Sequence, residues 1–145
     1  MEKVNISSLE EFEQKYKDII NIVSKNVSNI ETNNLVTFTK TPKGDATPNI
    51  EYNNGKFCYV ISERGEELER IESENPYYIM YILFQYITFL IASDYELKHR
   101  IISQDSRRLL FKYQVDLLRN ISEEWAKERL LAISAILEKH PYVDK

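Results

Sequence analysis

Residues 77–92, with the sequence YYIMYILFQYITFLIA, constrain the fold more than any other stretch of this chain. Only Gln85 and Thr88 are strongly polar interruptions of the run. Its apolar side chains recur at the i, i+3, i+4, i+7 spacing of a helix. The face predicted to be buried consists of Ile79, Ile82, Leu83, Tyr86, Ile87, Leu90 and Ile91. The opposite face, with Tyr77, Tyr81 and Phe84, is also apolar, so both faces of this central helix need partners.

The flanks of this run indicate where the helix begins and how it ends. Asn75 is a good N-cap, and Pro76 suits the first helical position because its missing N–H would be unpaired there anyway. Beyond residue 92 the helical spacing continues into a charged segment that ends at Arg100. The apolar run is shorter than the roughly 20 residues that a bilayer core requires. We therefore predict a core helix and no membrane partner.

Length and composition are those of a folded domain in a reducing compartment. The chain has 145 residues, of which 43% are hydrophobic and 29% charged, which predicts one domain over residues 1–145. Cys58 is the only cysteine, so no internal disulfide is available. The first residues contain no apolar segment of the kind a signal peptide needs. These features predict a cytoplasmic location.

The remaining segments predict an α+β fold. Ser7 or Ser8 can cap a first helix that ends near Lys25, with an inner stripe of Leu9, Phe12, Tyr16, Ile19, Ile20 and Val23. Short strands are predicted at residues 35–39, 50–53, 56–62 and 67–73, with turns at Asn54-Gly55 and Arg64-Gly65.

Two more helices follow the central one. Ser103 or Asp105 can cap the first and Ser122 the second, whose inner stripe is Ala126, Leu130, Ile133 and Leu137. The predicted order is an N-terminal helix, an antiparallel β-meander of three or four strands, and three packed C-terminal helices.

The residues that could carry catalysis do not form a recognisable set. Cys58 lies in the middle of an apolar strand, far in sequence from His99 and His140, so we interpret it as a core residue. Glu96 and His99 form one Glu-x-x-His, whereas a di-metal bundle needs two. Trp125 is interpreted as a core anchor. The sequence therefore predicts no catalytic, metal or cofactor site and no enzyme.

Acidic residues concentrate between positions 63 and 74. This segment contains six glutamates and only two arginines. Such a run disfavours nucleic acid as a partner and favours a basic protein surface, although a solvated hairpin is the commoner fate of a charge run. Farther along the chain, Arg100, Arg107 and Arg108 have the charge for a phosphate-binding cluster. We interpret them instead as partners of acidic neighbours, Glu96 and Asp105 among them, in structural ion pairs.

From Phe57 to Tyr142 the chain resembles the immunity protein 63 family of bacterial polymorphic toxin systems. The resemblance lies in FCYVISERGEELER followed by an aromatic helix, in ASDYELKHRIISQDSRRLLFKYQVDLL, and in a closing helix that ends KHPYVD. It implies an inhibitor that binds and neutralises a cognate secreted toxin by protein contact, and it implies no catalytic residues. Many toxins of this kind are nucleases, so a nuclease is the toxin class that we consider first.

The resemblance and the charge together locate a hypothetical partner-binding surface. We predict that it consists of Glu63, Glu66, Glu67, Glu69, Glu72, Glu74, Tyr77 and Tyr78. Two other functions stay open at this point: a small cytosolic adaptor unrelated to toxins, and a hydrolase, which would need a deep pocket with converging titratable residues. The ten tyrosines suit a protein interface, and a homodimer is also left open.

Overall fold

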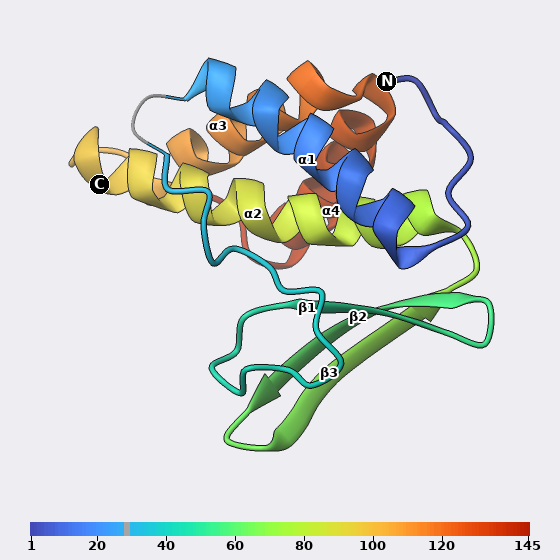
Figure 1. Ribbon diagram of the computed structural model, residues 1–145. Helices are drawn as coiled ribbons and strands as arrows, with labels where there is room; N and C mark the ends of the chain where they lie inside the picture. The colour runs from blue at the N-terminus through green and yellow to red at the C-terminus, as the bar shows by residue number, and fades with distance from the viewer. Residues whose placement is uncertain (28–29) are drawn as a thin grey trace. The chain divides into compact units, whose positions relative to one another are not determined.

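A computed structural model describes residues 1–27 and 30–145 of the chain (Figure 1). The elements in order are α1 (Leu9–Asn26), β1 (Asn49–Asn53), β2 (Lys56–Glu63), β3 (Glu66–Ser73), α2 (Pro76–Lys98), α3 (Ser106–Ile121) and α4 (Glu123–Lys139). This is the α+β order that the sequence predicts. The chain divides into two compact units, Met1–Leu83 and Phe84–Lys145, with the boundary inside α2. The expectation of a single domain over residues 1–145 stays a prediction.

Helix α1 forms as its capping residues and apolar stripe predict. The Ser8 hydroxyl accepts a hydrogen bond from the Glu11 N–H at 3.1 Å, and the Glu11 carboxylate accepts one from the Ser7 N–H at 3.1 Å. The two hydrogen bonds of a capping box are therefore divided between Ser8 and Ser7. The buried face consists of Phe12, Tyr16, Ile19, Ile20 and Val23. The Phe12 ring stacks on Phe57 of β2 with centroids 5.4 Å apart. This contact packs α1 on the sheet.

The sheet is an antiparallel meander in the order β1-β2-β3. Both connections are two-residue turns with positive φ at each residue: 53° and 77° at Asn54-Gly55, and 53° and 79° at Arg64-Gly65. These angles belong to the type I′ turn that the Asn-Gly dipeptide predicts. The central strand β2 is buried on both faces, with Phe57, Cys58, Tyr59 and Val60 all at 4% exposure or less, so the prediction of an inner strand is confirmed.

The prediction of a strand at residues 35–39 is wrong. Only Thr37 makes a bridge, to Asn49, and the rest of the segment has no ladder. The buried Asn49 side chain takes the place of that ladder: its Oδ1 accepts from the Thr37 hydroxyl at 2.6 Å and the Thr39 N–H at 3.1 Å, and its Nδ2 donates to the Thr39 carbonyl at 2.9 Å. The meander therefore has three strands.

Helix α2 begins at the predicted cap, where the Asn75 side chain accepts from the Tyr77 N–H at 2.9 Å. Ile79, Leu83 and Ile87 are fully buried, as predicted. The face is nevertheless rotated from the predicted one, because Phe84 is fully buried whereas Leu90 is 41% exposed. A run that is apolar all round does not encode by its period which side is covered.

By length and composition alone, α2 is long enough to cross a membrane. The helix extends beyond the apolar stretch 77–92, so the length argument against a membrane span does not hold. The core helix of a soluble protein meets the same criterion, and 39% of the relevant window is buried in the structure. This property of α2 is therefore weak evidence for a membrane partner.

The second unit contains the rest of α2 together with α3 and α4. Asp105 and Ser122 cap α3 and α4 through hydrogen bonds from the Arg107 and Trp125 N–H groups. Trp125 is 4% exposed and its ring stacks with Phe84 of α2 at 6.1 Å, which confirms the prediction of a core anchor.

Replacing Asn49 tests whether its side chain holds the segment before β1. Asn49→Ala removes three hydrogen bonds that the fully buried Asn49 side chain makes to Thr37 and Thr39, so we expect the free energy of unfolding to fall by about 2–3 kcal/mol. Asn53→Ala is the matched control on the same strand, because Asn53 is exposed, and its effect should stay within about 0.5 kcal/mol. Urea unfolding measures both. Equal effects would contradict the role of Asn49.

Candidate functional site

The predicted glutamates all lie on β3 or directly beside it. Glu63 ends β2, four more belong to β3, and Glu74 follows the strand. The six are Glu63, Glu66, Glu67, Glu69, Glu72 and Glu74, and each is exposed. We use the name acidic strand for β3 together with these six glutamates. The structure thus brings the predicted carboxylates together on one edge of the sheet.

Arg70 neutralises only part of the acidic strand. Its guanidinium pairs with Glu67 at 2.7 Å, Glu51 at 3.4 Å and Glu72 at 3.6 Å. Hydrogen bonding with Glu67 raises the pKa of Arg70 and lowers the pKa of Glu67, so the pair is held in its charged form. Within the described residues, the other four glutamates of the acidic strand form no ion pair: Glu63, Glu66, Glu69 and Glu74.

The two predicted tyrosines have different roles. The Tyr77 hydroxyl donates to the Val4 carbonyl at 2.7 Å, and burial raises the pKa of Tyr77, so this hydroxyl ties the N-terminal segment to α2. Tyr78 is 48% exposed. Of the pair, Tyr78 is therefore the one that offers its ring to a partner.

Cys58 does not have the surroundings of a nucleophile. The thiol is buried and lies 3.4 Å from the Glu72 carboxylate. Burial, together with the hydrogen bond to Glu72, raises the pKa of Cys58. Because the thiolate is the reactive form, this thiol is held in the unreactive one. Within residues 1–27 and 30–145, no group of three or more His, Cys, Asp or Glu side chains could hold a metal ion.

In the second unit, Arg100 forms the ion pair that the helical spacing predicts. Its Nε and Nη2 donate to the two oxygens of Glu96 at 3.0 and 2.7 Å. Glu96 is 3% exposed, and the hydrogen bond from Arg100 lowers its pKa. The pair links Arg100, just after α2, to the last turn of that helix, so we assign it a structural role.

Arg107 joins the start of α3 to the C-terminal tail. Its guanidinium donates to Asp105 at 2.9 Å and to the carbonyls of His140 and Pro141 at 2.8 and 2.9 Å. The Val143 N–H adds a further contact between the tail and α3, because it donates to the Asp105 carboxylate at 2.9 Å.

Arg108 makes a second set of contacts to the same tail. It pairs with Asp144 at 2.9 Å, and its guanidinium lies 4.2 Å from the ring centroid of Tyr142. We call this set of contacts the C-terminal clasp: Asp105, Arg107, Arg108, Tyr142 and Asp144. Arg107 and Arg108 are thus used to hold the chain together, and the structure favours the ion-pair interpretation over a phosphate-binding cluster. The tail side of the clasp was missed, because only folding brings residues 105 and 144 together.

A buried polar network connects the helices of the second unit. The Gln114 amide donates to the Gln85 carbonyl at 2.9 Å and to the Thr88 hydroxyl at 3.3 Å, and its oxygen accepts from Arg129 Nε at 2.9 Å. Gln114 and Thr88 are fully buried and Arg129 is 6% exposed. Sequence reasoning missed this network; the polar residues inside apolar stripes were its only signal. Because its members satisfy one another, we assign it to fold specificity.

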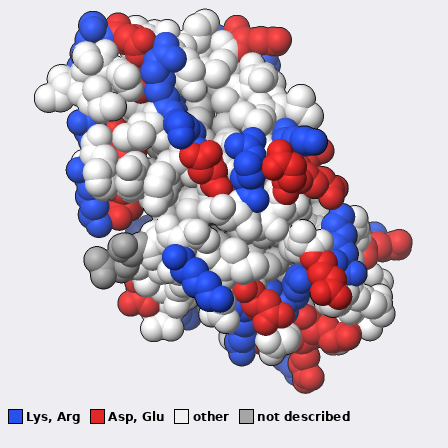
Figure 2. Space-filling view, turned by 90° about the horizontal axis from the view of Figure 1, so that it is seen from above, with Lys and Arg blue, Asp and Glu red and all other residues white. Residues whose placement is uncertain are grey.

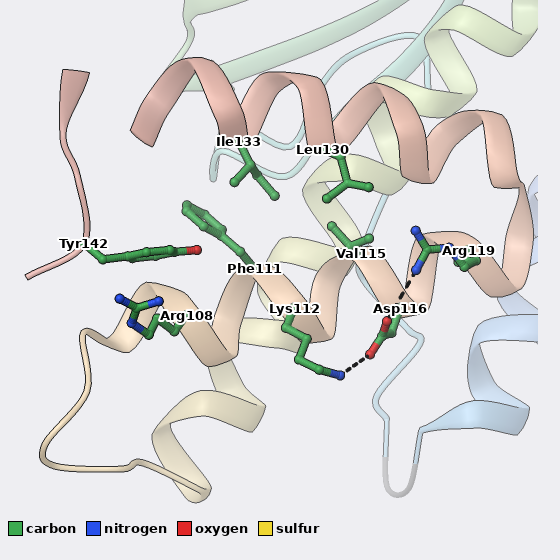
Figure 3. Close-up of a pocket in the computed structure, with 9 residues that line it drawn as sticks. All are labelled: Arg108, Phe111, Lys112, Val115, Asp116, Arg119, Leu130, Ile133 and Tyr142. Atoms are coloured by element: carbon green, nitrogen blue, oxygen red, sulfur yellow. Dashed lines mark hydrogen bonds and ion pairs between the residues drawn. The ribbon is translucent and has the colours of Figure 1, made fainter. Parts of the chain in front are cut away.

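A shallow groove of about 360 Å³ runs between α3 and α4 (Figure 3). Phe111, Leu130 and Ile133 form its apolar part, while Asp116 along the rim pairs with Lys112 at 3.0 Å and Arg119 at 3.8 Å. Leu130, which the sequence places inside, is 41% exposed here. The titratable groups at the rim pair with each other, so the groove does not have the converging set that a hydrolase would need.

The surface that Figure 2 shows carries charges of both signs. Blue and red side chains are interleaved there, with uncharged areas between them. This mixture agrees with the net charge of −4 over the whole chain. The acidic excess at β3 contrasts with the mixture of charges on the face that Figure 2 shows.

A known protein family matches this chain. The sequence profile described as immunity protein 63 matches residues 53–135, which cover β2, β3, α2, α3 and most of α4. No curated protein and no solved structure matches the chain. The chain belongs to the immunity protein 63 family, and it is thus an immunity protein whose partner is a toxin. The predicted family is confirmed, and the adaptor unrelated to toxins is set aside.

The C-terminal clasp predicts a pH-dependent stability. Hydrogen bonds from Arg107 and Arg108 lower the pKa values of Asp105 and Asp144. A lowered carboxyl pKa in the folded state contributes stability that is present above the unfolded pKa, about 3.9, and is lost as the pH falls below it. We expect the free energy of unfolding to decrease from about pH 5 downward.

Asp105→Asn isolates this contribution, because asparagine still caps α3 but carries no charge. The variant should be less stable than the parent at pH 7, and the difference should shrink below about pH 4. Asp94→Asn is the control, since Asp94 forms an exposed i,i+4 pair with Lys98 of the kind that contributes little. Urea unfolding at several pH values is the measurement. A difference for Asp105→Asn that does not change with pH would contradict this role of the clasp.

Proposed function

We propose that this immunity protein neutralises its toxin by direct protein contact through the acidic strand and Tyr78, in the cytoplasm, and that the toxin is a nuclease. The observation that carries the proposal is the unequal pairing at β3. Four exposed carboxylates there have no ion pair within the described residues, whereas Arg70, Arg100, Arg107 and Arg108 are each paired.

Unpaired carboxylates on β3 and directly beside it make a local negative potential. Such a potential speeds the encounter with a positively charged partner and disfavours partners of like charge. Tyr78 next to this strand in sequence can supply a large contact area with little loss of side-chain entropy. The acidic strand and Tyr78 together therefore suit a protein interface with a basic surface.

A nuclease is the class of toxin that fits this charge. Its active site must attract a polyanionic backbone, so its cleft is lined with cationic groups. A row of glutamates matches the sign of the phosphates that the cleft binds. Inhibition by occupying such a cleft needs one immunity protein per toxin and no catalysis.

Charge reversal on the acidic strand tests the interface. Glu66→Lys with Glu69→Lys changes two unpaired carboxylates, so we expect the Kd for the toxin to rise about 10- to 100-fold, mainly through slower association, and its salt dependence to weaken. Glu128→Lys with Glu138→Lys on α4 changes the net charge equally and should shift the Kd less than about threefold. Surface plasmon resonance at several salt concentrations measures both pairs. Equal effects of the two pairs would exclude the acidic strand.

Co-expression tests neutralisation itself. The toxin domain encoded beside this protein should stop the growth of a bacterial host, and this protein should restore growth and co-purify with the toxin. A well-expressed, folded protein that neither restores growth nor forms a complex would contradict the proposed pairing. A complex without restored growth would show binding away from the site that the toxin needs.

A further inference from the structure

The two edges of the sheet are not equivalent. On the outer side of β1, the Thr37 N–H donates to the Pro48 carbonyl and the Ile50 N–H donates to the Thr37 carbonyl, both at 2.9 Å. The segment before β1 therefore covers that edge. On the outer side of β3, no backbone hydrogen bond to any described residue is present, and residues 66–70 are all exposed. The open edge belongs to β3 (Figure 1).

The register identifies which backbone groups of β3 face outward. Lys56 directly follows a two-residue turn, so its backbone groups point to β1, and successive residues of β2 then alternate in direction. Tyr59 accordingly points to β3, where its partner is Ile71. The neighbours of Ile71, which are Arg70 and Glu72, therefore direct their N–H and C=O groups away from β2.

The same alternation can be checked on the covered edge. Ile50 of β1 is the other partner of Tyr59, so its backbone groups must point away from β2. Its N–H does so, because it donates to Thr37 outside the sheet. The assignment of outward groups on β3 rests on this confirmed pattern.

We infer that the toxin contributes an extended, basic segment that pairs with residues 69–73 as a fourth strand of the sheet. The backbone groups of Arg70 and Glu72 offer two donors and two acceptors for this pairing. Main-chain hydrogen bonds of this kind supply affinity, while alternate side chains supply specificity. This inference rests on the proposed function, since the partner is the toxin that the acidic strand attracts.

The charge of the acidic strand determines which side chains the added segment should carry. Its six glutamates outnumber its two arginines, and opposite charges on adjacent strands stabilise the pairing whereas like charges oppose it. Lysine or arginine at alternate positions of the added segment would lie next to Glu69 or Glu72. A second copy of this chain would instead bring the same acidic excess to the edge, which disfavours it as the occupant.

A bulge limits the length of the pairing. The register shifts between Ile61 and Ser62, so that Leu68 has no partner across the sheet. Leu68 is 54% exposed. The regular part of the edge thus spans residues 69–73, and the exposed Leu68 side chain lies where the added segment would leave the sheet.

A proline at Glu72 separates main-chain pairing from charge. Glu72→Pro removes an outward N–H without removing a bond to β2, and proline is tolerated at such edge positions. Glu72→Gln removes the same charge and keeps the N–H. With the toxin domain that this protein neutralises in co-expression, we expect Glu72→Pro to raise the Kd about 10- to 100-fold and Glu72→Gln to raise it several-fold less.

Amide hydrogen exchange on the unaltered protein gives an independent readout. The amides of Arg70 and Glu72 should exchange quickly in the free protein and at least about tenfold more slowly in the complex. The Ile71 amide, which is bonded to β2, serves as the internal control and should be protected in both states. This measurement stands even where Glu72→Pro lowers stability.

The possible results separate this inference from the proposed function. A complex in which Glu72→Pro and Glu72→Gln behave alike, with Arg70 and Glu72 still exchanging quickly, would overturn strand addition and leave the charge-based interface in place. Protection of these amides that rises with protein concentration in the absence of toxin would assign the edge to a second copy and overturn the inference. Absence of any complex would overturn both proposals.

Discussion

The fold depends on burying a helix that has no polar face along most of its length. Within α2, Ile79, Met80 and Leu83 are fully buried before the unit boundary, and Phe84 and Ile87 are fully buried after it. These apolar side chains would be exposed to water if either half of α2 lacked packing partners. Both compact units are therefore built on the same helix, and the chain before and after α2 supplies a separate core for each half.

Arginine pairing organises the polar part of each unit. In the first unit Arg70 is shared among Glu51, Glu67 and Glu72, while in the second unit Arg107 and Arg108 bind the C-terminal tail. Bidentate and carbonyl contacts of this type fix geometry as well as charge. Arg70 pairs with two of the six glutamates of the acidic strand, Glu67 and Glu72, so within the described residues this strand keeps an excess of unpaired carboxylate.

The acidic strand combines two properties that act at different ranges. The carboxylates act over about a Debye length and affect how fast a partner arrives, whereas an open sheet edge acts only at hydrogen-bond distance and affects how long the partner stays. A short meander with one covered and one open edge presents both properties on β3. This is a suitable arrangement for an inhibitor that must find a toxin quickly and hold it.

Local structure could be predicted from the sequence where it depends on residues that are close together in the chain. The caps at Ser8, Asn75 and Ser122, the two type I′ turns and the burial of β2 all depend on residues close together in the chain, and the resemblance to immunity protein 63 was carried by contiguous motifs. The family match over residues 53–135 confirmed that resemblance. The clustering of the six glutamates was likewise predictable, because they occupy one strand and its flanks.

Contacts between distant residues were decided only by the tertiary structure. Asn49 replaced a predicted strand with side-chain hydrogen bonds to Thr39, and α2 buried Phe84 where periodicity had favoured Leu90, because a helix that is apolar all round leaves the choice of face to its neighbours. The clasp between Asp105 and Val143 and the Gln114–Arg129 network also needed folding to bring their members together. The sequence by itself thus determined the order of the helices and of the three meander strands, the turns between those strands and the acidic strand. Tertiary packing determined which faces are buried, which arginines are engaged and which edge of the sheet stays open, since these depend on what each element meets in space.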